Sequence, residues 1–293
     1  MAATRPARVT VPAVRARKVR PGEGTPPLVM ITAYDAPTAR IADEAGVDIV
    51  LVGDSVAMVV LGYEDTLQVT VDDMVHHTAA VARTRPRPLV VADMPWLSYH
   101  LGVDDTVRNA GRLVRAGAEA VKLEGGRKRL PVIGALVDAE IPVMGHLGLT
   151  PQSVHAVGGY KVQGKDVTAA TALVDDARAL ADAGCFAIVL EAVPAPVARL
   201  VTEAVEVPTI GIGAGPSCDG QVLVFHDAVG LEDRILPRFV RRYASLKADA
   251  VGAVAAYAAD VRSGRFPGDE ESYHLGDDAA TALGLYGGAS KSA

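Results

Sequence analysis

Short apolar runs recur along this chain, and longer segments with a helical spacing of apolar residues lie between them. The runs are rich in β-branched residues and apolar on both faces, which is typical of parallel strands covered by helices. They predict eight buried strands, at residues 28–32, 49–53, 88–92, 119–123, 141–145, 186–190, 208–212 and 221–225.

Start and stop signals predict helices between these strands. Thr70 and Asp73 have the spacing of a capping box at the start of one helix. Gly117 and Gly184 stand where two other helices should end. The clearest predicted helices span residues 71–83, 103–116, 168–183, 196–206 and 244–262.

An eightfold strand–helix alternation favours a (β/α)₈ barrel, and a chain of 293 residues suits one barrel of about 250 residues. A doubly wound open sheet is the alternative, because the number of strands does not prove closure. We expect a basic arm at residues 1–26, one barrel domain at 27–275 and a flexible tail at 276–293. The long connections 55–69 and 146–166 are expected to be binding loops or lids.

Composition narrows the class of protein. Hydrophobic residues make up 49% and aromatic residues only 4%, which suits a packed enzyme core and not an aromatic nucleic-acid platform. No apolar run approaches the roughly 18 residues of a membrane helix, and no secretory signal is visible. Only Cys185 and Cys218 are present, without a CxxC pair, so we expect a cytoplasmic protein.

Charge is distributed unevenly. The net charge is −6, but residues 1–26 carry six basic residues against Glu23 alone, which leaves −11 for the remainder. An Arg-rich start can resemble an organelle transit peptide or a nucleic-acid contact. We favour an arm that packs over the barrel or a neighbouring subunit, since an acidic protein is a poor nucleic-acid binder.

Ionisable residues follow five of the predicted strands. In a barrel, the active site lies at the carboxyl ends of the strands. The residues at those ends are Asp54 with Ser55, Asp93, Lys122 with Glu124, His146 and Glu191.

Three of these acids, Asp54, Asp93 and Glu124, would meet at one opening of the barrel. Such a cluster is unfavourable without a cation or a proton, and oxygen ligands favour Mg²⁺. Lys122 suits a substrate carboxylate or a developing enolate. A single acid at a strand end can instead cap a helix, and His146 can as well bond a loop carbonyl.

Together with these residues, several motifs resemble the ketopantoate hydroxymethyltransferase family. GHLGLTPQS at 145–153 and GGYKVQG at 158–164 are the most specific of them. The resemblance runs from about residue 10 to residue 274. Ala57 and Gln68 are small departures from the residues that are usual in the family at these positions. The other matching stretches are MITAYD (30–35), VGDS (52–55), VDDMVHHTAAV (71–81), ADMP (92–95), VKLEGG (121–126), LE (190–191), GIGAG (211–215) and HD (226–227).

The resemblance implies a barrel of the phosphoenolpyruvate mutase and isocitrate lyase superfamily, assembled as a homo-oligomer and commonly a decamer. It implies transfer of a one-carbon unit from 5,10-methylenetetrahydrofolate to 3-methyl-2-oxobutanoate, giving 2-dehydropantoate for pantothenate and coenzyme A synthesis through a Mg²⁺-stabilised enolate. The implied residue roles are metal site for Asp54, Asp93 and Glu124, substrate contact for Asp54, Ser55, Asp93 and Lys122, proton acceptor for Glu191 and possible support for His146.

Two rival interpretations remain. Another Mg²⁺ enolate enzyme of the same superfamily, such as a lyase or mutase, would lack GHLGLTPQS and GGYKVQG. A non-catalytic barrel that binds a ligand or scaffolds a complex would have no reason to collect these charges at one rim.

Overall fold

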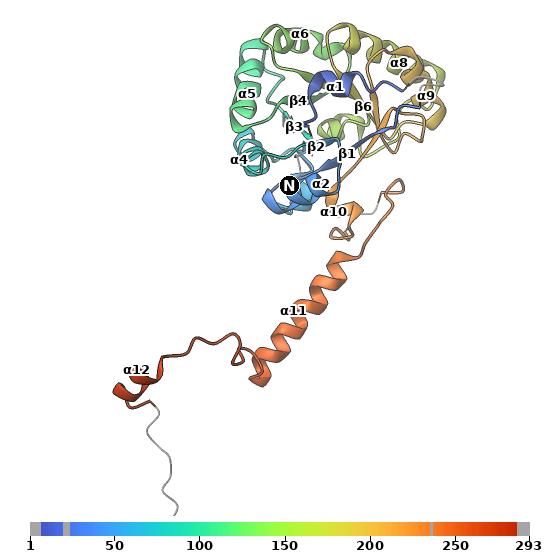
Figure 1. Ribbon diagram of the computed structural model, residues 1–293. Coiled ribbons are helices and arrows are strands. Elements are labelled where there is room, and N and C mark those ends of the chain that lie inside the picture. The colour runs from blue at the N-terminus through green and yellow to red at the C-terminus, as the bar shows by residue number, and fades with distance from the viewer. Residues whose placement is uncertain (1–6, 20–23, 235–236, 286–293) are drawn as a thin grey trace, which may run out of the picture. The chain divides into compact units, whose positions relative to one another are not determined.

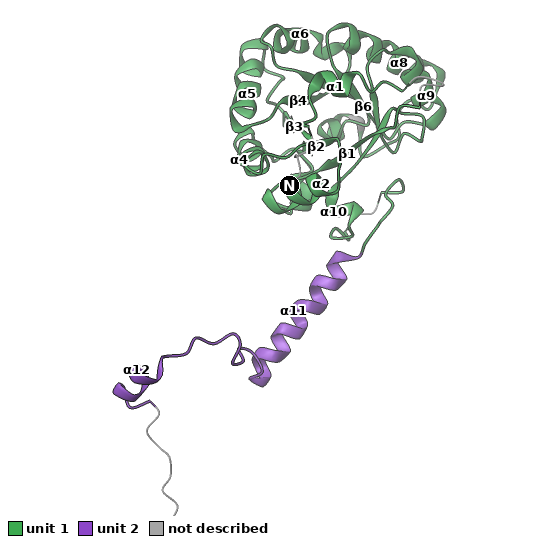
Figure 2. Cartoon of the chain, viewed as in Figure 1, with its two compact units in different colours: residues 1–244 green, residues 245–293 purple. Residues whose placement is uncertain are grey.

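The computed structural model describes residues 7–19, 24–234 and 237–285. It divides the chain into two compact units, residues 1–244 and residues 245–293, which Figure 2 shows in different colours. Within the described ranges, no helix has both the length and the hydropathy that crossing a bilayer requires.

The first unit contains a closed barrel of eight parallel strands that follow chain order. Strand β8 pairs with β1, with Leu28 opposite Gly220, so the sheet closes and the open doubly wound alternative is excluded. The (β/α)₈ prediction is confirmed. The strands are β1 (Leu28–Thr32), β2 (Ile49–Val52), β3 (Leu89–Asp93), β4 (Ala120–Glu124), β5 (Val143–Gly148), β6 (Ala187–Glu191), β7 (Thr209–Ile212) and β8 (Gly220–Leu223).

Longer helices surround the barrel as a ring (Figure 1). They are α2 (Ala36–Glu44), α4 (Val71–Ala82), α5 (Val103–Ala116), α6 (Leu130–Asp138), α8 (Val167–Asp182) and α9 (Ala195–Ala204). The predicted capping box between Thr70 and Asp73 is present, and Gly117 ends α5 with a left-handed backbone. Short helices are α1 (Val11–Arg15), α3 (Val56–Val59), α7 (Val154–Val157), α10 (Phe225–Ala228) and the 3₁₀ turns Arg127–Arg129 and Pro151–Ser153.

Alternation along the strands separates two apolar layers. Val50 and Val90 belong to the layer between strands and helices. Leu51, Leu89 and Met144 belong to a second cluster, which fills the barrel. Because side chains two apart share a face of a strand, the inward positions of β3 to β6 continue upward from apolar to ionisable residues. The strand pattern that builds the core therefore also builds the polar rim.

The described part of the N-terminal arm packs against the barrel. Val14 of α1 is fully buried in the cluster that fills the barrel, and Val9 and Val11 are partly buried beside it. Lys18 Nζ lies 2.9 Å from Asp219 Oδ2. This part of the arm is a structural element of the barrel unit, whereas residues 1–6 and 20–23 lie outside the described residues.

The second unit contains α11 (Leu246–Ser263) and α12 (Asp277–Ala282). None of the residues of α11 is buried. That unit ends at residue 244, whereas we expected the barrel domain to extend to 275. The predicted flexible tail at 276–293 includes α12, and its residues 286–293 lie outside the described ranges.

Candidate active site

Adjacent strands place the ionisable residues side by side at the carboxyl end of the barrel. Asp93 of β3 is in register with Lys122 of β4, and Glu124 of β4 with His146 of β5. Glu191 ends β6 opposite Gly148 of β5. Since inward side chains of neighbouring strands meet, these residues share one rim, as predicted.

The rim surrounds a cavity of about 850 Å³. All residues that the sequence analysis proposed for the site line this cavity, so the structure brings them together. They are Asp54, Ser55, Asp93, Lys122, Glu124, His146 and Glu191. Its size lies in the range of cavities that hold drug-sized ligands, about 300–1,000 Å³.

Lys122 is a buried cation at the floor of the site. Its Nζ lies 3.0 Å from Asp93 Oδ1 and 3.2 Å from His146 Nδ1. Burial disfavours the charged ammonium, but Asp93, Glu124 and Asp54 outweigh burial and hold the pKa of Lys122 above its ordinary value. Lys122 therefore carries a permanent positive charge that faces the cavity.

Asp54 and Asp93 are neighbouring buried acids in the site. The backbone N–H of Asp54 donates to Asp93 Oδ2 at 3.0 Å, so the two acids lie together. Burial, with the negative charges of Asp93 and Glu124, raises the pKa of Asp54 well above its ordinary value. The pair therefore needs either a proton or additional positive charge.

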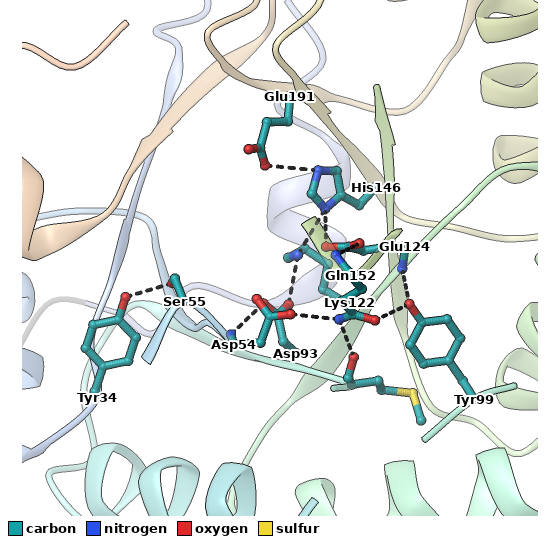
Figure 3. Close-up of polar contacts among 11 residues, drawn as sticks. Tyr34, Asp54, Ser55, Asp93, Tyr99, Lys122, Glu124, His146, Gln152 and Glu191 are labelled. Atoms are coloured by element: carbon teal, nitrogen blue, oxygen red, sulfur yellow. Dashed lines mark hydrogen bonds and ion pairs between the residues drawn. The ribbon is translucent and has the colours of Figure 1, made fainter. Parts of the chain in front are cut away.

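His146 lies between two carboxylates (Figure 3). Its Nδ1 is 3.5 Å from Glu124 Oε1, and its Nε2 is 3.3 Å from Glu191 Oε2. Burial and Lys122 oppose its positive charge, but Glu124 and Glu191 prevail and raise the pKa of His146 to about 9. A carboxylate faces each ring nitrogen, and the two together outweigh Lys122, whose Nζ lies 3.2 Å from Nδ1.

Sequence reasoning missed three contributors. Gln152, from the 3₁₀ turn after β5, contacts both Asp54 and Glu124. Tyr99 bonds Gln152, and the hydroxyl of Tyr34 lies 2.8 Å from Ser55 Oγ. Gln152 and Tyr34 stand inside motifs that carried the family resemblance, which was the one available signal; Tyr99 had none.

The donor set fits a hard divalent cation. Among the residues at the strand ends, with all groups charged, four carboxylates (Asp54, Asp93, Glu124 and Glu191) face two cations (Lys122 and His146), which leaves two negative charges, the charge of one divalent ion, to be balanced. Asp93 Oδ1 is buried 3.0 Å from Lys122 Nζ but receives no well-aligned hydrogen bond, which leaves a lone pair available. Carboxylate oxygens are the ligands that Mg²⁺ prefers.

The three predicted metal acids do not form one preformed ligand group. Among the residues that the structure describes, no three Asp, Glu, His or Cys side chains are arranged to hold one ion. Both oxygens of Glu124 are already engaged, one by the backbone N–H of Gln152 and one beside His146. Direct ligation by Asp54 and Asp93, with Glu124 acting through water, suits Mg²⁺, which usually retains several waters.

Comparison with known sequences identifies close relatives. The family described as ketopantoate hydroxymethyltransferase matches residues 8–269. A 3-methyl-2-oxobutanoate hydroxymethyltransferase from Oleidesulfovibrio alaskensis is 57% identical over 267 residues, covering 91% of this chain and 92% of the relative. One of the same name from Moorella thermoacetica is 55% identical and covers 91% and 98%.

Solved structures agree on the fold. Phosphonopyruvate hydrolase in complex with oxalate and Mg²⁺ gives a TM-score of 0.57 at 17% identity, covering 94% of this chain and 98% of that structure. A 2,3-dimethylmalate lyase of the phosphoenolpyruvate mutase and isocitrate lyase superfamily gives 0.56 at 19%, covering 95% and 99%. At these identities the likeness concerns the barrel alone and assigns no chemistry.

Proposed function

Since the chain belongs to the ketopantoate hydroxymethyltransferase family, and is therefore a transferase, we propose that its site catalyses the following one-carbon transfer. It transfers a hydroxymethyl group from 5,10-methylenetetrahydrofolate to 3-methyl-2-oxobutanoate and gives 2-dehydropantoate, on the route to pantothenate. The observation that carries the proposal is the convergence of Lys122, Asp93 and Glu191 on one cavity of about 850 Å³. A five-carbon keto acid fills only part of such a cavity, which leaves room for the folate.

The keto acid binds at the floor of the cavity in this proposal. Asp54 and Asp93 would hold Mg²⁺ directly, and Glu124 would do so through water. When bound, Mg²⁺ supplies Lewis-acid polarisation of the keto acid. The hydroxyl of Ser55, oriented by Tyr34, donates to the substrate, and Lys122 Nζ offsets the negative charge that develops on the keto oxygen.

Glu191 removes the C3 proton. Its side chain is only partly buried and lines the cavity. It comes from β6, apart from the acids that follow β2 and end β3 and β4. His146 contacts Glu191 and orients its carboxylate. The carbon left by the proton bonds to the folate methylene carbon as one of the two bonds from the methylene carbon to folate nitrogen breaks. Water then supplies the new hydroxyl as the second of these carbon–nitrogen bonds breaks. The C3 proton and the second proton of water end on the two folate nitrogens, and tetrahydrofolate leaves, so atoms balance.

The test separates proton removal from binding. Glu191→Gln keeps the size of the side chain and removes the base, so hydrogen–deuterium exchange at C3 should fall by about a hundred- to ten-thousand-fold. Mg²⁺ and keto acid should still bind. Glu203→Gln is the matched control, because Glu203 is exposed on α9. Exchange at the wild-type rate in Glu191→Gln would contradict the assignment and turn attention to His146.

Metal dependence provides a second arm of this test. Thorough chelation should abolish turnover, and added Mg²⁺ should restore it. Full turnover by the metal-free protein would rule out the metal site. Asp54→Asn and Asp93→Asn should each weaken Mg²⁺ binding, since each removes a charged ligand, and unchanged affinity in both would refute their role as ligands.

Two wider features accompany the proposed function. We place the reaction in the cytoplasm and expect a homo-oligomer, a decamer by family resemblance. Sedimentation of the full chain would measure the assembly, and a monomer at micromolar concentration would contradict it.

A further inference from the structure

Gln152 contacts two acids of the site, although it lies in a turn and not on a strand. Its Nε2 donates to Asp54 Oδ2 at 2.8 Å and to the carbonyl of Met94 at 3.0 Å. Its backbone N–H donates to Glu124 Oε2 at 3.0 Å. The residue is 5% exposed, so it meets these partners out of water. One residue from a loop thus ties together the acid that follows β2 and the acid that ends β4.

Tyr99 fixes which way the Gln152 amide faces. The Tyr99 hydroxyl accepts from the backbone N–H of Glu124 at 3.2 Å and donates to Gln152 Oε1 at 2.5 Å. Since Oε1 is occupied by a donor, the NH₂ end must face Asp54 and the Met94 carbonyl. The hydrogen bonds therefore run in one direction, from Glu124 through Tyr99 and Gln152 to Asp54 (Figure 3).

A neutral amide suits this position. A lysine or arginine would offer Asp54 a permanent counter-charge and compete with a metal ion, whereas a glutamate would repel it. Glutamine donates without adding charge, so it holds the carboxylate of Asp54 by one oxygen and leaves the other oxygen available. Partners of this kind orient ligands and tune metal affinity.

We propose that Gln152 is a positioning residue, latched by Tyr99, that holds Asp54 and Glu124 in the arrangement that binds the divalent cation. The inference rests on the proposed metal-dependent function. It concerns residues that do not touch the reacting atoms, so their effect passes through the two acids. Substitution of either residue should therefore lower cation affinity directly and turnover only as a consequence.

The test is a Mn²⁺ titration of the full-length protein, followed by electron paramagnetic resonance of free Mn²⁺. Gln152→Met keeps the length of the side chain and removes both side-chain donors, and should weaken Mn²⁺ binding about 10- to 100-fold. Tyr99→Phe removes the latch but keeps the amide, so it should weaken binding less. Gln221→Met is the matched control: its exposed side chain bonds the Gly215 carbonyl, away from the acids, and binding should stay unchanged.

Turnover separates positioning from a general loss of structure. If Gln152 acts through the metal, saturating Mg²⁺ should recover much of the kcat of Gln152→Met, whereas a damaged fold should not respond to metal. Tyr99→Phe provides the test if Gln152→Met does not fold. Wild-type Mn²⁺ affinity in both variants overturns the inference and leaves the proposed function intact. No Mn²⁺ binding by the wild-type protein overturns both.

Discussion

The arm beneath the barrel can be tested through one buried ion pair. Lys18 Nζ lies 2.9 Å from Asp219 Oδ2 and donates to the carbonyl of Thr202 at 2.6 Å. The side chains are 12% and 1% exposed, so the pair is largely shielded from water. Lys18→Met keeps the apolar stem and removes the charge, which leaves Asp219 buried without its cation.

The expected loss of stability depends on the contacts that Asp219 keeps in the variant. Removing one partner of a buried pair costs about 3–5 kcal/mol. Asp219 keeps hydrogen bonds from the backbone N–H groups of Val19 and Thr209 and from the Thr209 hydroxyl. These contacts offset part of the loss, so we expect about 3 kcal/mol for Lys18→Met. The double variant Lys18→Met/Asp219→Asn should lose less than the sum of the single variants, because no buried charge is left unpaired.

Urea unfolding monitored by Trp96 fluorescence and circular dichroism measures these losses, since Trp96 is the only tryptophan of the chain. Arg8→Met is the control: Arg8 pairs with Glu119 at 3.0 Å, but the side chains are 54% and 30% exposed, so at most about 1 kcal/mol is expected. Lys18→Met within about 0.5 kcal/mol of the wild type, an effect typical of a surface site, would refute the reasoning. So would strict additivity in the double variant.

The same reasoning extends to the arm as a whole. Deleting residues 1–20 removes both Lys18 and Val14, whose burial contributes about 1.5–3 kcal/mol. We therefore predict that the arm is not a cleaved targeting peptide, and that the truncated protein loses solubility or assembly. A truncated protein with wild-type stability would restore the transit-peptide interpretation.

Two further predictions concern the rim. Gly148 has φ +91°, and a Cβ there would lie 2.2 Å from the Glu191 carbonyl oxygen. Gly148→Ala should therefore destabilise the fold by more than about 1 kcal/mol and lower kcat. Gly134→Ala on α6 is the control, because its Cβ meets no atom within 4 Å, and equal stability of the two variants would contradict the prediction. Burial and Glu232 raise the pKa of Asp227 to about 6, so the folded state binds the extra proton and loses stability as pH rises from about 4 through 6. Thermal unfolding should therefore show Asp227→Asn to be about 1 kcal/mol more stable than the wild type at pH 8, a value reduced for partial exposure, and equally stable at pH 4. The same difference in stability at both pH values would refute the predicted pH dependence.

The strand pattern predicted much of the molecule because one periodicity governs both core and site. Leu89 and Val91 fill the barrel, and Asp93 is the next inward position on the same strand. Once strand boundaries are known to within a residue, the ionisable rim follows. The prediction of a helix at 244–262 is confirmed by α11, but none of its residues is buried, because a sequence pattern can show that a helix forms without showing what covers it.

Gln152 and Tyr99 mark a second limit, and its cause is geometric. Asp93 and Glu124 lie on strands, where a period of two residues decides the side that each faces. Gln152 lies in a 3₁₀ turn after β5, and its partners are 98 positions away at Asp54 and 28 positions away at Glu124. No local period links such positions, so only the closed barrel brings them into contact. The charges of the site could therefore be predicted from local pattern, whereas the neutral groups that orient them depend on tertiary structure, and variants of those groups should alter cation affinity without altering the net charge of the site.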